Sequence, residues 1–210
     1  MQRYIPCLLF VLALSLPVAA LAGERNGCAP EYRALYKNAV VALQGTGDGD
    51  VVVVTDPLCW HCRLGHKLLG EYPELYRTVR LSFFPRLSYP GSDMAAWILE
   101  DAVGTDQLKA MVDFAYTDLK RIKTDDLIKA RLMILMQFTE AFPHLLDGTT
   151  EAKLAVRLQK EHELHTMLTA DLAKAADLPG TPILVAGKTV LVGFGPGPWL
   201  DALKALAVCP

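Results

Sequence analysis

Two cysteines separated by two residues are the side chains of this sequence best suited to chemistry. They lie in the motif Cys59-Trp60-His61-Cys62. Two thiols at this spacing at the start of a helix face each other across one turn, so they can close a small disulfide and open it again. The motif predicts a redox-active dithiol. Cys59 is expected to be the exposed nucleophile, and Cys62 the resolving thiol that attacks the mixed disulfide.

A position at the start of a helix favours the anionic form of Cys59. Unpaired backbone N–H groups and the helix dipole stabilise negative charge at this end of a helix. The pKa of Cys59 is therefore expected to fall well below the value of about 8.5 for a free thiol. His61, when protonated, would add to this effect. A lower thiol pKa stabilises the reduced protein and so makes the disulfide more oxidising.

Cysteines at this spacing also build half of many zinc sites, which is the alternative hypothesis for the motif. The remaining ligands would have to come from His66, in the same predicted helix, or from His162 and His165. The last two lie in a charged helical stretch and are expected to be solvated surface residues. We predict no bound metal. A module that holds copper or zinc on the two thiolates, which are soft ligands, is kept as the alternative function.

The segments on either side of the motif predict how it is positioned. Residues 51–54 are four consecutive valines, and β-branched runs of this kind are typical of strands buried on both faces. This strand is expected at the centre of a sheet, followed by a helix over residues 62–72 that stops at Pro73. A second strand over residues 79–84 ends at Pro85 and completes a right-handed βαβ unit. A dithiol that follows a strand and opens a helix favours redox chemistry over metal binding.

The rest of the chain changes from a mixed pattern to a helical one and back again. Residues 93–178 are expected to form four helices, three of them preceded by a threonine at the N-cap. After Gly180-Thr181-Pro182 the pattern predicts a hairpin and a last helix. The predicted helices are 94–103, 106–119 behind Thr105, 125–142 behind Thr124 and 151–176 behind Thr150; the hairpin strands are 183–185 and 189–192, with a turn at Gly187-Lys188, and the last helix is 199–208.

The order of these elements predicts the fold. An amphipathic lead-in helix is expected over residues 31–43, within an N-terminal segment 23–49. A βαβ unit, a helical block and a ββα unit follow. This order predicts an α/β thioredoxin fold in residues 50–208, with a helical insertion at about residues 93–178 between the two halves.

The first 22 residues have the features of a cleaved secretory signal peptide. An apolar run follows Arg3, and Ala20-Leu21-Ala22 has the small-residue form of a cleavage site. The run is short and is interrupted by Pro17, which argues against a membrane anchor. We therefore expect an exported protein that is not embedded in a membrane after cleavage. The net charge of −2, with no basic cluster, argues against nucleic acid and anionic membrane surfaces as partners.

The chain has five cysteines, and Cys7 would leave with the signal peptide. The other four allow three pairings in an oxidising compartment. Besides the pair in the motif, Cys28 and Cys209 would join the two ends of the mature chain. A loop of that length stabilises the protein by about 5 kcal/mol in the chain-entropy model. The alternative is two unpaired cysteines in frayed tails.

Several segments resemble the thioredoxin superfamily and, within it, the bacterial periplasmic Dsb proteins. The likeness is greatest to the DsbC and DsbG isomerase branch and covers residues 50–89 and 175–207. The stretch over residues 54–62 is similar to the segment that leads from strand to active site in that branch. Further points of likeness are Asp56, three residues before the first cysteine, Phe84-Pro85-Arg86, Gly180-Thr181-Pro182, the hairpin and Gly193.

This resemblance implies thiol–disulfide exchange on exported, cysteine-containing proteins in the periplasm, with no cofactor besides the dithiol itself. It also implies a membrane redox partner that resets the dithiol. In the family, the bond before the proline at the position of Pro182 is cis and packs against the dithiol, where Thr181-Pro182 presents its backbone to an extended substrate. A cis X-Pro bond costs only about 0.5–1 kcal/mol, so this geometry is accessible.

The direction of the reaction stays open at this stage. Thr181 is similar to the isomerase branch, since DsbA oxidases usually have valine there, but the N-terminal segment is too short for the dimerisation domain of that branch. The size of the helical block and His61 are similar to DsbA, whereas Trp60 fits neither group. Val53 stands where thioredoxin has a buried acid, so the proton acceptor that thioredoxin uses is missing. The client, the redox partner and the oligomeric state are also open.

Overall fold

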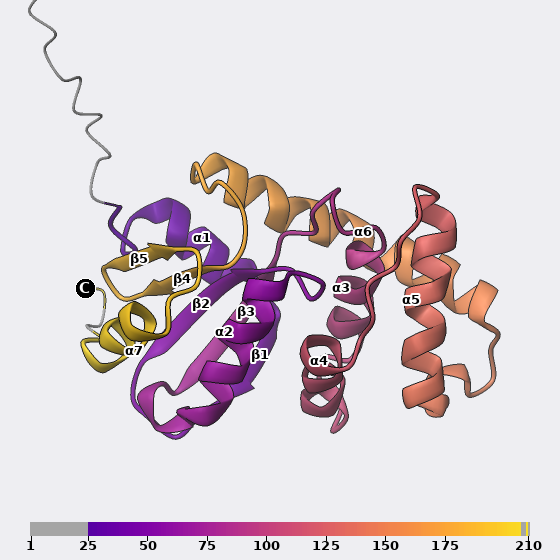
Figure 1. The fold of residues 1–210 in the computed structure, drawn as a ribbon, viewed down its shortest axis with the longest axis horizontal. Helices are drawn as coiled ribbons and strands as arrows, with labels where there is room; N and C mark the ends of the chain where they lie inside the picture. The colour runs from indigo at the N-terminus through magenta and orange to yellow at the C-terminus, as the bar shows by residue number, and fades with distance from the viewer. Residues whose placement is uncertain (1–24, 207–208, 210) are drawn as a thin grey trace, which may run out of the picture.

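Five strands form one mixed sheet in the order β1-β3-β2-β4-β5 (Figure 1). The computed structural model describes residues 25–206 and 209, so the predicted signal peptide over residues 1–22 lies outside the described residues. β2 is the central strand, as the valine run predicts, and lies parallel to β3 and antiparallel to β4. The strands are β1 (Val41–Gln44), β2 (Asp50–Thr55), β3 (Thr78–Phe83), β4 (Ile183–Ala186) and β5 (Thr189–Val192).

Alternate valines of β2 serve two separate cores, because successive side chains of a strand point to opposite faces of the sheet. Val51 and Val53 belong to the larger core, together with residues of α2 and α7. Val52 and Val54 belong to a smaller core with residues of α1 and the C-terminal end of α6. The helices that cover the sheet are α1 (Pro30–Asn38), α2 (Trp60–Glu71), the end of α6 (Glu151–Ala175) and α7 (Pro196–Lys204).

Four helices separate β3 from β4 and lie to one side of the sheet (Figure 1). The last of them, α6, returns to the sheet, where the Thr169 hydroxyl donates a hydrogen bond of 2.8 Å to the carbonyl of Phe83 at the end of β3. The block is made of α3 (Ser92–Asp101), α4 (Leu108–Thr117), α5 (Leu127–Ala141) and α6, with a short 3-10 turn at Pro143–Leu146 between α5 and α6. Another 3-10 turn, Pro73–Leu75, lies between α2 and β3. Among residues 25–206 and 209, no helix is both long and apolar enough to cross a membrane.

The helix predicted over residues 31–43 is wrong in its second half. The helix ends at Asn38, and Val41–Gln44 is the edge strand β1, antiparallel to β3. The pairing with β3 defines this strand, since Val41 lies opposite Leu81 and Gln44 opposite Thr78. Residues 40–43 fit a helical period equally well by type alone. The edge of β3 decides the outcome. If residues 41–44 were helical, the backbone N–H and C=O groups along that edge of β3 would have no partner, whereas strand β1 pairs with them.

Several helix starts also differ from the prediction, and α2 and α3 each begin two residues earlier than predicted, at Trp60 and Ser92. Thr150 caps α6 as expected, but α4 begins after Gln107, since the Thr105 hydroxyl instead bonds the carbonyl of Ala102. α5 is capped by Asp126 rather than Thr124. The last helix is predicted over residues 199–208, but α7 begins at Pro196 and ends at Lys204. Proline suits the first position of a helix because it has no N–H group that would be left unpaired there.

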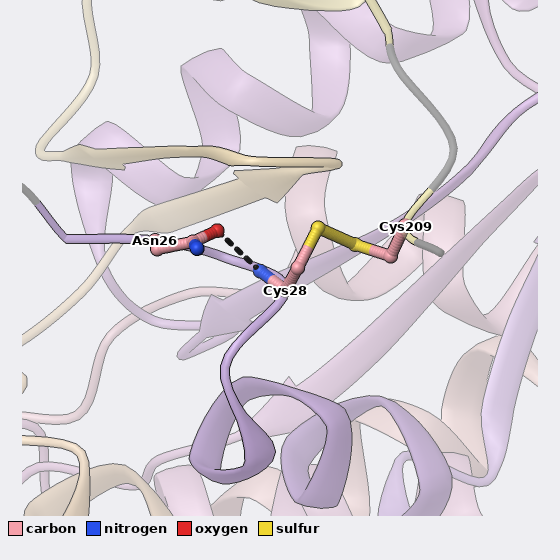
Figure 2. The surroundings of a disulfide bond; sticks show 3 residues. All are labelled: Asn26, Cys28 and Cys209. Carbon is pink, nitrogen blue, oxygen red and sulfur yellow. Dashed lines mark hydrogen bonds between the residues drawn. A yellow bond between two sulfur atoms is a disulfide. The ribbon is translucent and has the colours of Figure 1, made fainter.

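The ends of the described chain are joined by a disulfide between Cys28 and Cys209, with a Cα–Cα distance of 5.4 Å (Figure 2). The bridge spans 181 residues of sequence. Figure 2 also shows the backbone N–H of Cys28 donating to the side-chain oxygen of Asn26, at 3.1 Å. Cross-linking positions so far apart in sequence restricts the unfolded chain strongly, so the bridge stabilises the fold.

The expectation that His162 and His165 are solvated is wrong. Their side chains are 19% and 27% exposed and lie against Glu100, a nearly fully buried residue of α3. Nδ1 of His165 lies 3.0 Å from Glu100, and its Nε2 lies 3.0 Å from the carbonyl of Asn38. Both partners are acceptors when Glu100 is ionised, so a protonated imidazole satisfies both. The hydrogen bond to Glu100 is the main cause of a raised pKa at His165.

We predict that His165→Gln loses stability mainly at low pH. Because the pKa of His165 is raised in the folded state, its contribution is fully present below the unfolded value of about 6.5 and is lost as pH rises through the folded pKa. The difference in free energy of unfolding between the variant and the wild type should therefore shrink from pH 6 to pH 9. Urea denaturation at several pH values measures it; a difference that grows with pH would contradict the assignment.

Gly65 marks a close approach between α2 and α7. A Cβ built at Gly65 would lie 2.7 Å and 2.8 Å from ring atoms of Trp199, which is 1% exposed and has no room to move. Gly70, in the same helix, has no atom within 4 Å of its built Cβ.

We therefore predict opposite effects for the same substitution at these two glycines. Gly65→Ala should destabilise the protein by about 1–3 kcal/mol through overpacking. Gly70→Ala should stabilise it by about 0.5–1 kcal/mol, because alanine favours a helix. Thermal and chemical denaturation of both variants measure this, and equal effects would contradict the packing of Trp199 on α2.

Candidate active site

The end of the central strand carries both cysteines of the motif. β2 stops at Thr55, a turn follows in which the N–H of Cys59 bonds the carbonyl of Asp56 at 3.0 Å, and α2 starts at Trp60. Cys59 is the N-cap residue of α2, and Cys62 lies within its first turn. Both cysteines carry free thiols. This places the sulfur of Cys59 at the end of the helix where unpaired N–H groups favour an anion.

The two thiols have opposite acidities. The pKa of Cys59 is lowered to about 5. The main cause is a hydrogen bond from the Cys62 thiol, which outweighs the opposing effect of burial. The backbone N–H groups of Cys62 and His61 lower the pKa further. Burial raises the pKa of Cys62 far above its ordinary value, and the neighbouring Cys59 thiolate raises it further. Cys59 is therefore a thiolate at neutral pH and Cys62 a thiol. His61 acts on Cys59 through its backbone, while its imidazole lies exposed.

Thr181 and Pro182 lie directly beside the dithiol although they are more than a hundred residues away in sequence. The peptide bond between them is cis. The sulfur of Cys59 lies 3.7 Å from the carbonyl oxygen of Thr181. The buried Thr181 hydroxyl has no hydrogen-bond partner among the described residues in this reduced state, and its proximity lowers the pKa of both cysteines.

Cys59 was expected to be exposed, but it is 2% exposed. Thr181 lies against its sulfur. Tyr89, from the loop after β3, also faces it, and burial and then the charge of the Cys59 thiolate raise the pKa of this phenol. Arg121 lies over the Tyr89 ring at 4.5 Å and donates to the carbonyl of Leu58 at 2.7 Å. The neighbouring Trp60 is 60% exposed instead. A client must therefore approach past Trp60, Tyr89 and the Thr181 loop to reach the sulfur.

Hydrogen bonds from residues of α2 and α4 hold the turn that precedes the dithiol. Arg63 donates to the carbonyls of Pro57 and Leu119, which ties the start of α2 to the end of α4. Tyr116 is buried, and its hydroxyl shares a hydrogen bond of 2.9 Å with Thr55 at the end of β2. These contacts fix the turn between β2 and α2 in one geometry.

No histidine joins the dithiol in a metal site within the described chain. His66 stacks on Tyr116 and bonds Asp113 at 3.0 Å, and His162 and His165 lie at Glu100. Among residues 25–206 and 209, the one group of side chains with metal-ligand spacing is Asp101, Glu161 and His162. Arg157 already bonds Asp101 and Glu161 there, so these charges are neutralised. The arrangement does not favour the metal-binding alternative.

Sequence reasoning missed several residues of the site. Tyr89, Arg121 and Tyr116 carry no local signal, because each reaches the dithiol from a loop or helix whose position depends on the fold of the helical block. Asp56 was noted only as a point of family likeness, yet its side chain is completely buried beside the dithiol. Its position as an acidic residue directly after a buried strand is a local signal that could have marked it.

We predict that the thiolate of Cys59 forms with a midpoint near pH 5, as measured by its ultraviolet absorbance in the reduced protein. Cys62→Ala should raise that midpoint, because the main hydrogen bond to the thiolate is lost. Cys59→Ser should show no thiolate below about pH 9, since Cys62 alone is a buried thiol of raised pKa. A wild-type midpoint near 8.5, the value of a free thiol, would contradict the geometry.

Comparison with solved structures identifies the fold. A thioredoxin-like oxidoreductase from Silicibacter pomeroyi aligns with a TM-score of 0.60 at 21% identity, over 82% of this chain and 95% of that one. A periplasmic thioredoxin-like protein from Salmonella enterica serovar Typhimurium aligns at 0.59 and 19%, over 83% and 94%. The α-DsbA1 of Wolbachia pipientis aligns at 0.57 and 12%, over 79% and 89%.

Neither models of protein families nor curated protein sequences gave a match. The structural likeness therefore rests on the arrangement of the elements. The central β2 leads into α2, which carries the cysteines, and the β4-β5 hairpin follows a cis proline and pairs with β2 in the same sheet. Four helices are inserted between β3 and β4. The predicted fold class is confirmed: this chain has a thioredoxin-like α/β fold with a helical insertion.

Proposed function

We propose that this protein catalyses thiol–disulfide exchange through Cys59 and Cys62. The single observation that carries this proposal is the pair of free thiols with opposite acidities at the start of α2. A thiolate is the attacking species in disulfide exchange, and a neighbouring protonated thiol can later resolve the mixed disulfide. The thioredoxin-like fold supports the same reaction, since the aligned structure from Silicibacter pomeroyi is named an oxidoreductase. No cofactor besides the dithiol is needed.

The reduction of a client disulfide proceeds in two exchanges. The Cys59 thiolate attacks one client sulfur, so a Cys59–client disulfide forms, the client S–S bond breaks, and the other client sulfur leaves as a thiolate. Cys62 then loses its proton to that thiolate and attacks Cys59. The Cys59–Cys62 disulfide forms and the client is released with two reduced sulfurs. Oxidation of a client dithiol is the same sequence in reverse.

Thr181 and Pro182 are proposed as the platform for the client backbone. Their cis bond places the Thr181 carbonyl beside the attacking sulfur. An extended client segment that pairs with this loop would present its own sulfur to Cys59. Trp60, which is exposed at the start of α2, would lie against that segment and supply apolar contact.

The low pKa of the Cys59 thiol bears on the direction of exchange. A thiolate with a pKa of about 5 stabilises the reduced protein, which makes the disulfide oxidising relative to one built from thiols of ordinary pKa. We therefore propose that the protein oxidises clients when a redox partner keeps it oxidised. Thiol trapping in the native compartment tests this: a mostly reduced dithiol would instead point to a reductase or isomerase.

The proposed location is the periplasm, and the proposed clients are exported proteins with cysteines. The signal-like features of residues 1–22 support this, as does the disulfide between Cys28 and Cys209, which suits an oxidising compartment. One of the aligned structures is itself named periplasmic. We propose a membrane-bound redox partner, because the dithiol must be reset after each exchange.

We predict that Cys62→Ser accumulates a mixed disulfide with a synthetic peptide that contains one intramolecular disulfide, because the resolving thiol is gone. Cys59→Ser should form none, since the remaining thiol is buried and protonated. Mass spectrometry of the alkylated products measures both adducts. A mixed disulfide in Cys59→Ser, or none in Cys62→Ser, would overturn the assignment of nucleophile and resolving thiol.

A further inference from the structure

Asp56 is a buried acid that the exchange mechanism above does not use. Its side chain is 0% exposed. Oδ1 accepts the backbone N–H of Leu58 at 2.8 Å, and Oδ2 accepts the backbone N–H of Arg86 at 2.9 Å. Ser92, buried at the start of α3, adds a side-chain hydrogen bond. Within residues 25–206 and 209, no lysine, arginine or histidine forms an ion pair with this carboxylate.

These bonds connect three parts of the site. Leu58 belongs to the turn that leads to Cys59, and the carbonyl of Asp56 itself accepts the N–H of Cys59 at 3.0 Å. Arg86 begins the loop that carries Tyr89 to the dithiol. The carboxylate therefore holds the turn and the loop at a fixed distance from each other.

The same arrangement places the Asp56 carboxylate near the Cys59 thiolate, with no ion pair to either among the described residues. A buried carboxylate and a buried thiolate disfavour each other, because neither is screened by water. The titratable groups that face Asp56 are Cys59 and Arg63 from the start of α2, Tyr89 from the loop after β3 and Tyr116 from α4. Both phenols have raised pKa values, so they stay neutral near pH 7.

We infer that Asp56 is a positioning residue that ties the Cys59 turn to the loop after β3 and takes up a proton each time the dithiol is reduced. This inference rests on the proposed redox function. When a client dithiol reduces the Cys59–Cys62 disulfide, the S–S bond breaks and two electrons and two protons leave the client. Cys62 takes one proton as a thiol, Cys59 remains a thiolate, and the Asp56 carboxylate takes the second proton. On reoxidation the proton is released.

The acidity of Asp56 supports this step. Burial, and then the negative charge on Cys59, raise its pKa to about 7, against the opposing effect of the two backbone N–H groups. A group with this pKa changes its protonation near neutral pH when a charge appears beside it. Asp56 is fully buried, and its carboxylate and the Cys59 thiolate act on each other, so its protonation follows the state of the dithiol.

The test is the reduction potential of the Cys59–Cys62 pair from pH 6 to pH 8, measured by equilibration with a small dithiol buffer such as dithiothreitol. Each proton taken up per disulfide changes the equilibrium constant tenfold per pH unit, about 30 mV for this two-electron couple. The wild type should take up clearly more than one proton near pH 7. Asp56→Asn, which keeps the shape of the side chain, should take up one.

Two further variants separate charge from structure. Ser92→Ala removes one hydrogen bond but keeps the charge, so the steep part of the wild-type curve should move to higher pH. Asp147→Asn removes an exposed acid of the helical block and should leave the curve unchanged. Circular dichroism confirms that each variant is folded.

Equal slopes for the wild type and a folded Asp56→Asn would overturn the inference. If Asp56→Asn does not fold, an unmoved curve in Ser92→Ala overturns it instead. These measurements need no client. A failure of the proposed function shows separately, as the absence of a mixed disulfide with the peptide in Cys62→Ser.

Discussion

The antiparallel pairing of β2 with β4 is the interaction on which the site depends. Val54 lies opposite Ile183 in this register, so the residues that follow β2 and those that precede β4 meet at the same edge of the sheet. Cys59 comes from one side of this edge, and Thr181 from the other. A shift of the register by one residue would turn the inward side chains of β4 outward and move the cis peptide bond away from the sulfur.

The different reactivity of the two thiols follows from an unequal supply of hydrogen-bond donors at that edge. Cys59 receives hydrogen bonds from the helix start and from Cys62, whereas Cys62 has burial without comparable donors. Two identical side chains three residues apart thus acquire opposite roles. Asp56 adds a third buried acid, and no lysine, arginine or histidine of the described residues forms an ion pair with its carboxylate. Its protonation therefore depends on the charge of the neighbouring dithiol.

The helical block contributes to the site through its connections. The loop into α3 brings Tyr89 over Cys59, and the segment after α4 brings Arg121 onto Tyr89. α3 is almost wholly buried, because it packs against both α5 and α6. Glu100 and His165 join α3 to α6 in the same region. The insertion therefore determines how closely the sulfur of Cys59 is covered.

The sequence alone determined the central strand, the βαβ unit, the hairpin and the position of the dithiol, because valine runs, prolines and cysteine spacing act locally. Only the tertiary structure decided that residues 41–44 form a strand, since pairing with β3 outweighs an ambiguous local pattern. It also decided the burial of Cys59 and the contacts of His165, which depend on segments distant in the chain. Local patterns specify elements, whereas burial and charge partners arise only when those elements pack.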